Sequence, residues 1–167
     1  MLTERIEGKW IEMFVRTFRL CQIQAGDVVA ILSETQSRQV NVRLSELALH
    51  QIGARAFHVV MPSPPITTHV PVRSTGTSLA IGGVGPVVDA LAGTHTVIDC
   101  TVEGLLHAKE LRPILSKGAR VFMISNEHPE VLERCQPDPA LRAVVDEAKQ
   151  KLSKAHRWSG SIPTSLR

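Results

Sequence analysis

Val28-Val29-Ala30-Ile31-Leu32 decides the fold, because it is a continuous apolar run and not an alternating one. Such a run is typical of a strand covered on both faces, as in a parallel sheet. Gly26-Asp27 separates it from residues 3–20, whose apolar positions recur every three or four residues. That period predicts an amphipathic helix, with Thr3 as its N-cap.

The rest of the chain repeats this alternation of helices and apolar strands. Further strands are predicted near 54–61, 95–100 and 119–124. Further helices are predicted near 38–52, 84–92, 107–116, 129–135 and 138–155. This order predicts an α/β fold, a Rossmann-like doubly wound and mainly parallel sheet of about four strands with helices on both faces.

Composition excludes several classes of protein. Hydrophobic residues make up 43% and charged residues 21% of the 167 positions, which is enough apolar material for a core and excludes a mainly disordered chain. The net charge of +3 comes from residues 149–167, which hold five basic residues and no acid. With this basic excess confined to one end, and with only four Phe and two Trp, nucleic acid is not expected as a partner.

The cysteines and the N-terminus predict the compartment. Cys21, Cys100 and Cys135 are odd in number and lack C-x-x-C spacing, as expected for reduced thiols. The charged N-terminus lacks the apolar stretch of a signal peptide. No apolar run approaches the ~18–20 residues that span a bilayer. We expect a soluble, cytoplasmic protein without a membrane partner.

Candidate binding residues follow from the fold, because doubly wound sheets bind ligands beyond the carboxyl ends of their strands. Four segments occupy these positions: Ser33-Glu34-Thr35, residues 62–83, Thr101 to His107, and Ser125 to His128. The second of them is rich in proline and longer than the usual loop of ~2–6 residues, which favours a functional or flexible role.

Gly82-Gly83-Val84-Gly85-Pro86 resembles a phosphate-binding loop in composition only. Its spacing does not match the dinucleotide fingerprint, and the lysine of a Walker A motif is absent. Proline at a first helical position favours a helix start.

His107 is the candidate for general acid/base chemistry. Glu103 and Glu110 would share one side with it if the segment were helical, although Gly104 interrupts that helix. As a metal site this group is weak, because a second histidine is missing. A histidine at the carboxyl edge can take up and release a proton near neutral pH, but it is also an ordinary surface residue. Asp99 is predicted to cap the turn that follows its strand.

The order of elements and three phrases resemble the N-terminal domain of the 2,5-dihydroxypyridine dioxygenase family, which shares its fold with aminopeptidase T-like metallopeptidases. The resemblance covers roughly residues 8–158. Its phrases are Val97-Ile-Asp-Cys-Thr-Val-Glu-Gly-Leu-Leu-His107, the segment from Ile114 through Lys117, Gly118 and Arg120 to Phe122, and Glu127-His-Pro-Glu-Val-Leu-Glu-Arg134.

The resemblance implies a non-haem Fe(II) dioxygenase that cleaves a hydroxylated pyridine ring with O₂. Within it, His107 is expected to be the acid/base residue beside the substrate and Leu106 a wall of the pocket. Leu105, Thr101 and Ser33, at the same carboxyl edge, are the other expected substrate-binding residues. The metal ligands of both branches belong to a C-terminal domain, so we expect none in this chain.

We therefore assign residues 1–158 to an N-terminal α/β domain and 159–167 to a tail or the start of a missing metal-binding domain. The main hypothesis is a dioxygenase domain that is inactive by itself. Two alternatives stay open: the corresponding domain of an aminopeptidase T-like metallopeptidase, and a non-catalytic binding or assembly module that holds a small anion between Gly82 and Gly85. Apolar area left uncovered by a missing half predicts a homo-oligomer.

Overall fold

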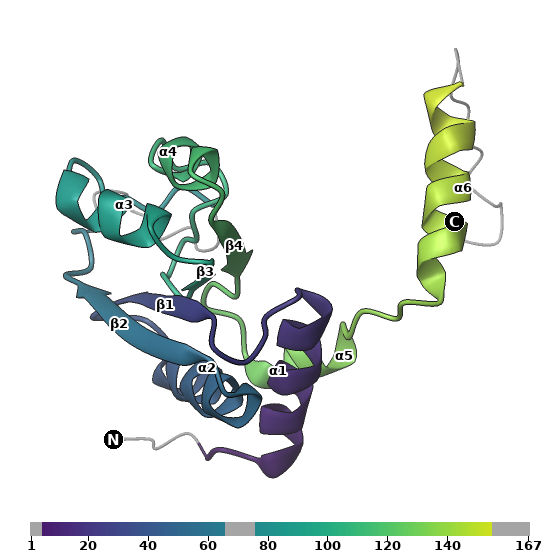
Figure 1. The fold of residues 1–167 in the computed structure, drawn as a ribbon, viewed down its shortest axis with the longest axis horizontal. Coiled ribbons are helices and arrows are strands. Elements are labelled where there is room, and N and C mark those ends of the chain that lie inside the picture. Colours follow the sequence, from purple (N-terminus) through teal and green to yellow (C-terminus); the bar gives the residue numbers. More distant parts are fainter. Residues whose placement is uncertain (1–4, 66–75, 155–167) are drawn as a thin grey trace, which may run out of the picture. The chain divides into compact units, whose positions relative to one another are not determined.

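The structure is a computed structural model that describes residues 5–65 and 76–154. Within these ranges, four parallel strands form one sheet in the order β2-β1-β3-β4 (Figure 1). The strands are β1 (Val28–Glu34), β2 (Arg55–Met61), β3 (Thr96–Asp99) and β4 (Arg120–Met123). The predicted doubly wound α/β fold is confirmed.

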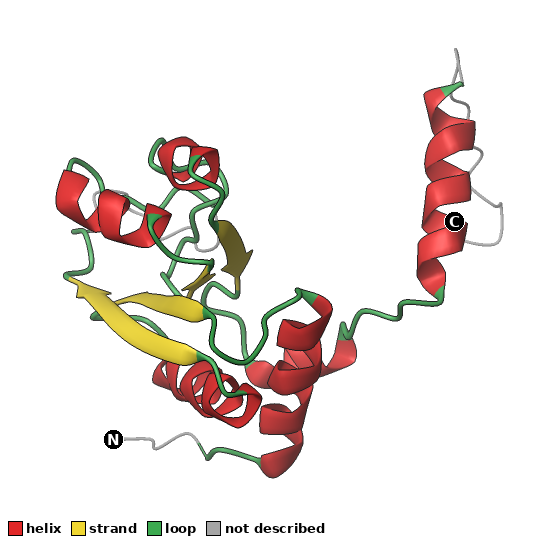
Figure 2. Ribbon diagram, in the orientation of Figure 1, coloured by secondary structure: helices red, strands yellow, loops and turns green. Residues whose placement is uncertain are grey.

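Helices cover both faces of the sheet (Figure 2). Those of the described residues are α1 (Gly8–Leu20), α2 (Gln39–Ile52), α3 (Gly85–Ala92), α4 (Leu111–Ser116), α5 (Pro129–Arg134) and α6 (Leu141–Ser153). The first two pack on one face, and α3 and α4 lie over the other (Figure 1). In the part of the chain that the structure describes, no helix is both long and apolar enough to cross a membrane.

The side chains of β1 divide the core into two layers. Val29 and Ile31 pack with residues of α1 and α2, whereas Ala30 and Leu32 pack with residues of α3 and α4. All four side chains are fully buried. The apolar run in the sequence is therefore explained by burial on both faces, as predicted.

The chain divides into two compact units, residues 1–136 and 137–167. The first contains the whole sheet and α1 to α5. The second contains α6, of which no described residue is buried. The boundary predicted between residues 158 and 159 lies outside the described residues.

The helix predicted over 107–116 is shorter in the structure, because α4 covers only its last six residues and 101–110 form turns and bends. The His107 N–H donates to the Gly76 carbonyl and not to a helical partner, and the preceding turn over 101–105 is shaped by the Asp99 side chain at the end of β3. Its carboxylate accepts hydrogen bonds from the backbone N–H groups of Thr101 and Leu105. Such local bonds compete with those of a helix.

Smaller differences concern the ends of elements. α1 begins at Gly8 with Glu7 as its N-cap residue, and the predicted N-cap Thr3 lies outside the described residues. The helix predicted over 138–155 begins at Leu141. Of the long loop predicted over 62–83, residues 66–75 lie outside the described part.

Candidate functional site

The path of the chain through the sheet reverses between β1 and β3. From β1 the chain continues outward to β2, and from β3 it continues outward to β4 on the other side. Ligands of open α/β sheets bind at the carboxyl ends of the strands, at such a switch point. Ser33 and Glu34 close β1, and the segment 100–107 follows β3, so two of the four predicted segments meet here.

Asp99 organises the turn that follows β3. Its Oδ1 accepts hydrogen bonds from the Thr101 backbone N–H at 3.0 Å and from the Thr101 hydroxyl at 2.7 Å. Its Oδ2 accepts one from the Leu105 N–H at 2.7 Å. The Thr101 hydroxyl in turn accepts a hydrogen bond from the Gly104 N–H at 3.1 Å. The turn therefore wraps around one buried carboxylate, and the predicted capping role of Asp99 is confirmed.

A second buried carboxylate reaches the same turn from the neighbouring strand. Glu34 is 2% exposed, and its Oε1 accepts a hydrogen bond from the Val102 N–H. Burial raises the pKa of Asp99 above its ordinary value, the hydrogen bonds from Thr101 and Leu105 lower that pKa, and the nearby Glu34 carboxylate raises it. Two acidic side chains therefore flank the switch point, and both accept backbone hydrogen bonds from the same turn, the one that follows β3.

His107 lies at the outer end of this turn and is exposed. Its backbone N–H donates a hydrogen bond to the Gly76 carbonyl. The Gly76 N–H donates to the Glu103 carbonyl at 2.6 Å, and the Ser78 N–H donates to the Gly104 carbonyl at 2.8 Å. Residues 76–78 therefore run alongside the turn that carries His107.

The five predicted site residues differ in access to solvent. His107 and Leu106 are exposed, the latter by 56%, and their side chains are open to contact by another molecule. Leu105, Thr101 and Ser33 are buried, Leu105 within the core layer of α3 and α4. In this conformation the structure brings only the first two to the surface, and the binding roles of all five stay predictions.

Gly76 is a feature that sequence reasoning missed. Its φ is +74°, and a Cβ at this position would lie 2.9 Å from the Leu106 Cβ and 3.1 Å from the His107 Cδ2. Only glycine allows this backbone conformation together with so close an approach. A glycine in the run Ser-Thr-Gly-Thr-Ser over 74–78 is a weak signal, because nothing in the sequence pairs it with residue 107.

The fourth predicted segment joins the end of β4 to the start of α2. The Arg38 N–H donates a hydrogen bond to the Asn126 Oδ1 at 2.9 Å, and the Asn41 amide donates to the Glu127 carbonyl at 2.7 Å. The segment therefore holds two elements of the scaffold together.

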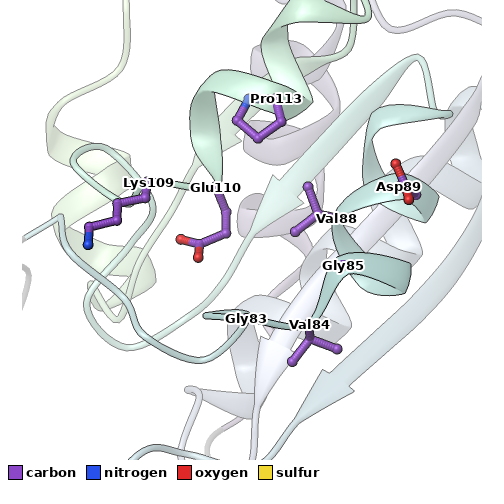
Figure 3. Close-up of a pocket in the computed structure, with 8 residues that line it drawn as sticks. All are labelled: Gly83, Val84, Gly85, Val88, Asp89, Lys109, Glu110 and Pro113. Atoms are coloured by element: carbon purple, nitrogen blue, oxygen red, sulfur yellow. The ribbon is translucent and has the colours of Figure 1, made fainter.

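The glycine-rich segment lines an open hollow of about 360 Å³ between α3 and α4. Figure 3 shows the Glu110 carboxylate pointing into this hollow, toward the glycine-rich segment. Asp89 also lines it and forms an ion pair with Lys117 at 2.8 Å. With Asp89 paired to Lys117, the remaining charged lining is Glu110 and Lys109, which gives no excess of positive charge. The lining therefore does not support the small-anion alternative.

Other titratable groups do not extend the site. Cys100 is fully buried, and burial raises the pKa of its thiol to about 12, so the reactive thiolate is suppressed. Over residues 5–65 and 76–154, no three His, Cys, Asp or Glu side chains are grouped so that they could hold a metal ion. The described residues therefore do not fit the iron that the resemblance implies.

Comparisons with known proteins identify relatives. The sequence model of the 2,5-dihydroxypyridine 5,6-dioxygenase family matches residues 9–159. The structure of 2,5-dihydroxypyridine dioxygenase from Pseudomonas putida KT2440 aligns with a TM-score of 0.76 and 26% identity. That alignment covers 87% of this chain and 42% of the dioxygenase, so the chain spans less than half the length of its relative.

A second solved structure is less similar. The N-terminal subdomain of NpsA from Klebsiella oxytoca aligns with a TM-score of 0.43 and 17% identity, over 83% of this chain and 29% of its own. That score is too low to bear on fold or function. No curated protein sequence matches the chain significantly.

Proposed function

The chain belongs to the 2,5-dihydroxypyridine 5,6-dioxygenase family, and from this premise we propose that it supplies a proton-transferring histidine, His107, to a ring-cleaving dioxygenase. The proposed substrates are a hydroxylated pyridine and O₂. The observation that carries the proposal is the place of His107, exposed on a turn at the carboxyl edge beside the switch point. Exposed Leu106 lies next to it in the chain.

In the proposed role, the His107 imidazole takes a proton from a ring hydroxyl of the substrate and returns one as the ring opens. Histidine suits this task because both protonation states are accessible near neutral pH. The hydrogen bond from the His107 backbone to Gly76 holds the residue at a defined place on the turn. Leu106 would cover an apolar face of the ring and exclude water.

The family suggests a metal cofactor in the full enzyme, and we propose Fe(II). When bound, iron would activate O₂ for ring cleavage. Because the described residues do not fit such a group, we propose that its ligands lie in a part of the parent enzyme that this chain does not cover. By this proposal the chain alone does not turn over.

A chimaera tests the role of His107. Residues 9–159 of this chain replace the matched part of the Pseudomonas putida dioxygenase, and loss of 2,5-dihydroxypyridine is followed by absorbance. We expect an active chimaera in which His107→Ala lowers kcat by about 100-fold or more, the range of general acid/base effects, at unchanged iron content.

His50→Ala is the matched control, since His50 is also exposed but lies at the end of α2. It should leave kcat unchanged. An active chimaera in which His107→Ala turns over like the parent would remove His107 from the mechanism.

The two other hypotheses keep the fold and change the chemistry. Release of an amino acid from a peptide by the parent protein would favour the aminopeptidase T-like function, and assembly without turnover would favour the non-catalytic module. We also propose that the protein forms a homo-oligomer and works in the cytoplasm; uncovered apolar residues on the surface support the first of these.

A further inference from the structure

The turn over 101–107 is anchored from the inside by one carboxylate. Asp99 accepts three hydrogen bonds from it, two from Thr101 and one from Leu105. No water competes for these bonds, because Asp99 is fully buried. The bond to Leu105 fixes the backbone two residues before His107.

A second anchor comes from the other side of the switch point. Glu34 stands on β1 and accepts the Val102 N–H, while the β1 carbonyl of Leu32 accepts the Cys100 N–H at 2.8 Å. The turn is therefore tied to both central strands. With one anchor it could pivot about β3, and with two its direction relative to the sheet is set.

We propose that Asp99 is the positioning residue of the His107 turn, with Glu34 as its second anchor. Neither side chain is proposed to touch substrate. Only the catalytic consequence rests on the proposed function of His107; the placement of the turn is a separate claim.

The number of donors explains why a carboxylate is needed at position 99. An ionised carboxylate only accepts hydrogen bonds and can accommodate all three donors. In Asp99→Asn one carboxylate oxygen becomes an NH₂ group, which donates hydrogen bonds and cannot accept them. This NH₂ group would face at least one N–H or O–H group of the turn, so at least one of the three hydrogen bonds is lost. Among the described residues, the Glu34 carboxylate accepts one hydrogen bond, from the Val102 N–H, and the carbonyl of a glutamine could still accept it. Asp99→Asn should therefore disturb the turn more than Glu34→Gln.

Amide hydrogen exchange of the 167-residue chain, measured by NMR, tests whether Asp99→Asn disturbs the turn more than Glu34→Gln does. We expect exchange at the Leu105 N–H to become at least 10-fold faster in Asp99→Asn and less than 3-fold faster in Glu34→Gln. The imidazole cross-peak of His107 should shift in Asp99→Asn. Asp27→Asn is the matched control, because Asp27 also accepts a backbone N–H, that of Gln24, but precedes β1 at the opposite edge of the sheet.

Leu105 exchange within 2-fold of the parent in a folded Asp99→Asn protein would overturn the proposal. Should that variant not fold, Thr101→Val decides, because it removes one donor and leaves the carboxylate in place. We then expect exchange at Gly104 and Leu105 to rise at least 3-fold, and unchanged exchange at both would refute the anchoring.

The chimaera separates this inference from the proposed function. If both hold, Asp99→Asn lowers kcat and leaves KM within about 2-fold. If His107→Ala leaves turnover unchanged while Asp99→Asn still frees the Leu105 N–H, the catalytic role fails and the anchoring stands. If His107→Ala lowers turnover while Leu105 exchange is unchanged in Asp99→Asn, the anchoring fails alone.

Discussion

At the end of β3 a single side chain both ends a strand and shapes a turn. Asp99 is short enough for its carboxylate to reach the N–H groups two and six residues further along the chain. The cost is the burial of an ionisable group next to a second acid, Glu34, which is reflected in the raised pKa of Asp99. Hydrogen bonds from Thr101 and Leu105 offset part of this cost.

The raised pKa of Asp99 predicts a pH-dependent stability. Between its ordinary value of 3.8 and the raised folded-state value, the folded chain binds more protons at this site than the unfolded chain. The contribution of Asp99 to the free energy of unfolding is therefore full below about pH 4 and falls as pH rises through the folded-state pKa. Urea unfolding of the unsubstituted chain and of Asp99→Asn between pH 4 and 7 checks this pH dependence.

The quantity to compare is the difference in free energy of unfolding between the unsubstituted chain and Asp99→Asn, because both proteins contain all the other titrating groups. We expect the unsubstituted chain to lose stability relative to Asp99→Asn as pH rises from 4 to 7. A difference that does not vary with pH would contradict the assigned pKa shift.

At the scale of elements, the candidate site is made where two irregular segments meet. Residues 76–78 lie in the long loop between β2 and α3, and residues 103–107 follow β3. Three backbone hydrogen bonds join them. Neither segment has a regular period of its own, so each is ordered by contacts with the other and with the buried acids.

Gly76→Ala tests the contact between these segments. The left-handed φ of +74° and the 2.9 Å approach to the Leu106 Cβ leave no room for a methyl group. We expect the free energy of unfolding to fall by about 1–3 kcal/mol and the NMR signals of Leu106 and His107 to move.

Gly8→Ala is the control, since a Cβ there would meet nothing within 4 Å and its φ is not left-handed. It begins α1, so stability should be unchanged or slightly higher. Equal stability of Gly76→Ala and the parent would show that the two segments are not packed as described.

At the scale of the whole molecule, apolar side chains are unevenly covered. The sheet and its flanking helices bury two apolar layers. The described part of α6 buries none, and its apolar residues recur at helical spacing: Leu141, Val144, Val145 and Leu152. Exposed apolar stripes of this kind are characteristic of interaction sites.

We expect the chain to associate with itself through this stripe. Sedimentation at rising concentration should show a rising average mass, and Val144→Glu should reduce it because a charge would be buried in the contact. Gln150→Glu, at an exposed position on the opposite side of the same helix, should have a smaller effect. A monomer at every concentration would refute the association.

The sequence by itself determined the order of strands and helices, the parallel sheet and the edge at which the candidate residues gather. These features depend on local periodicity and on short connections, which a linear pattern records. The capping role of Asp99 was predictable for the same reason, because its partners lie within six residues.

Only the tertiary structure decided that residues 107–110 form turns and not the start of a helix, that Leu105 is buried while Leu106 and His107 are exposed, and that Gly76 touches the His107 turn. Each outcome depends on groups far apart in the chain; Glu34 and Val102, for example, are 68 residues apart. The free energy of such contacts comes from burial and packing between segments, and these interactions do not produce a recurring pattern in the sequence.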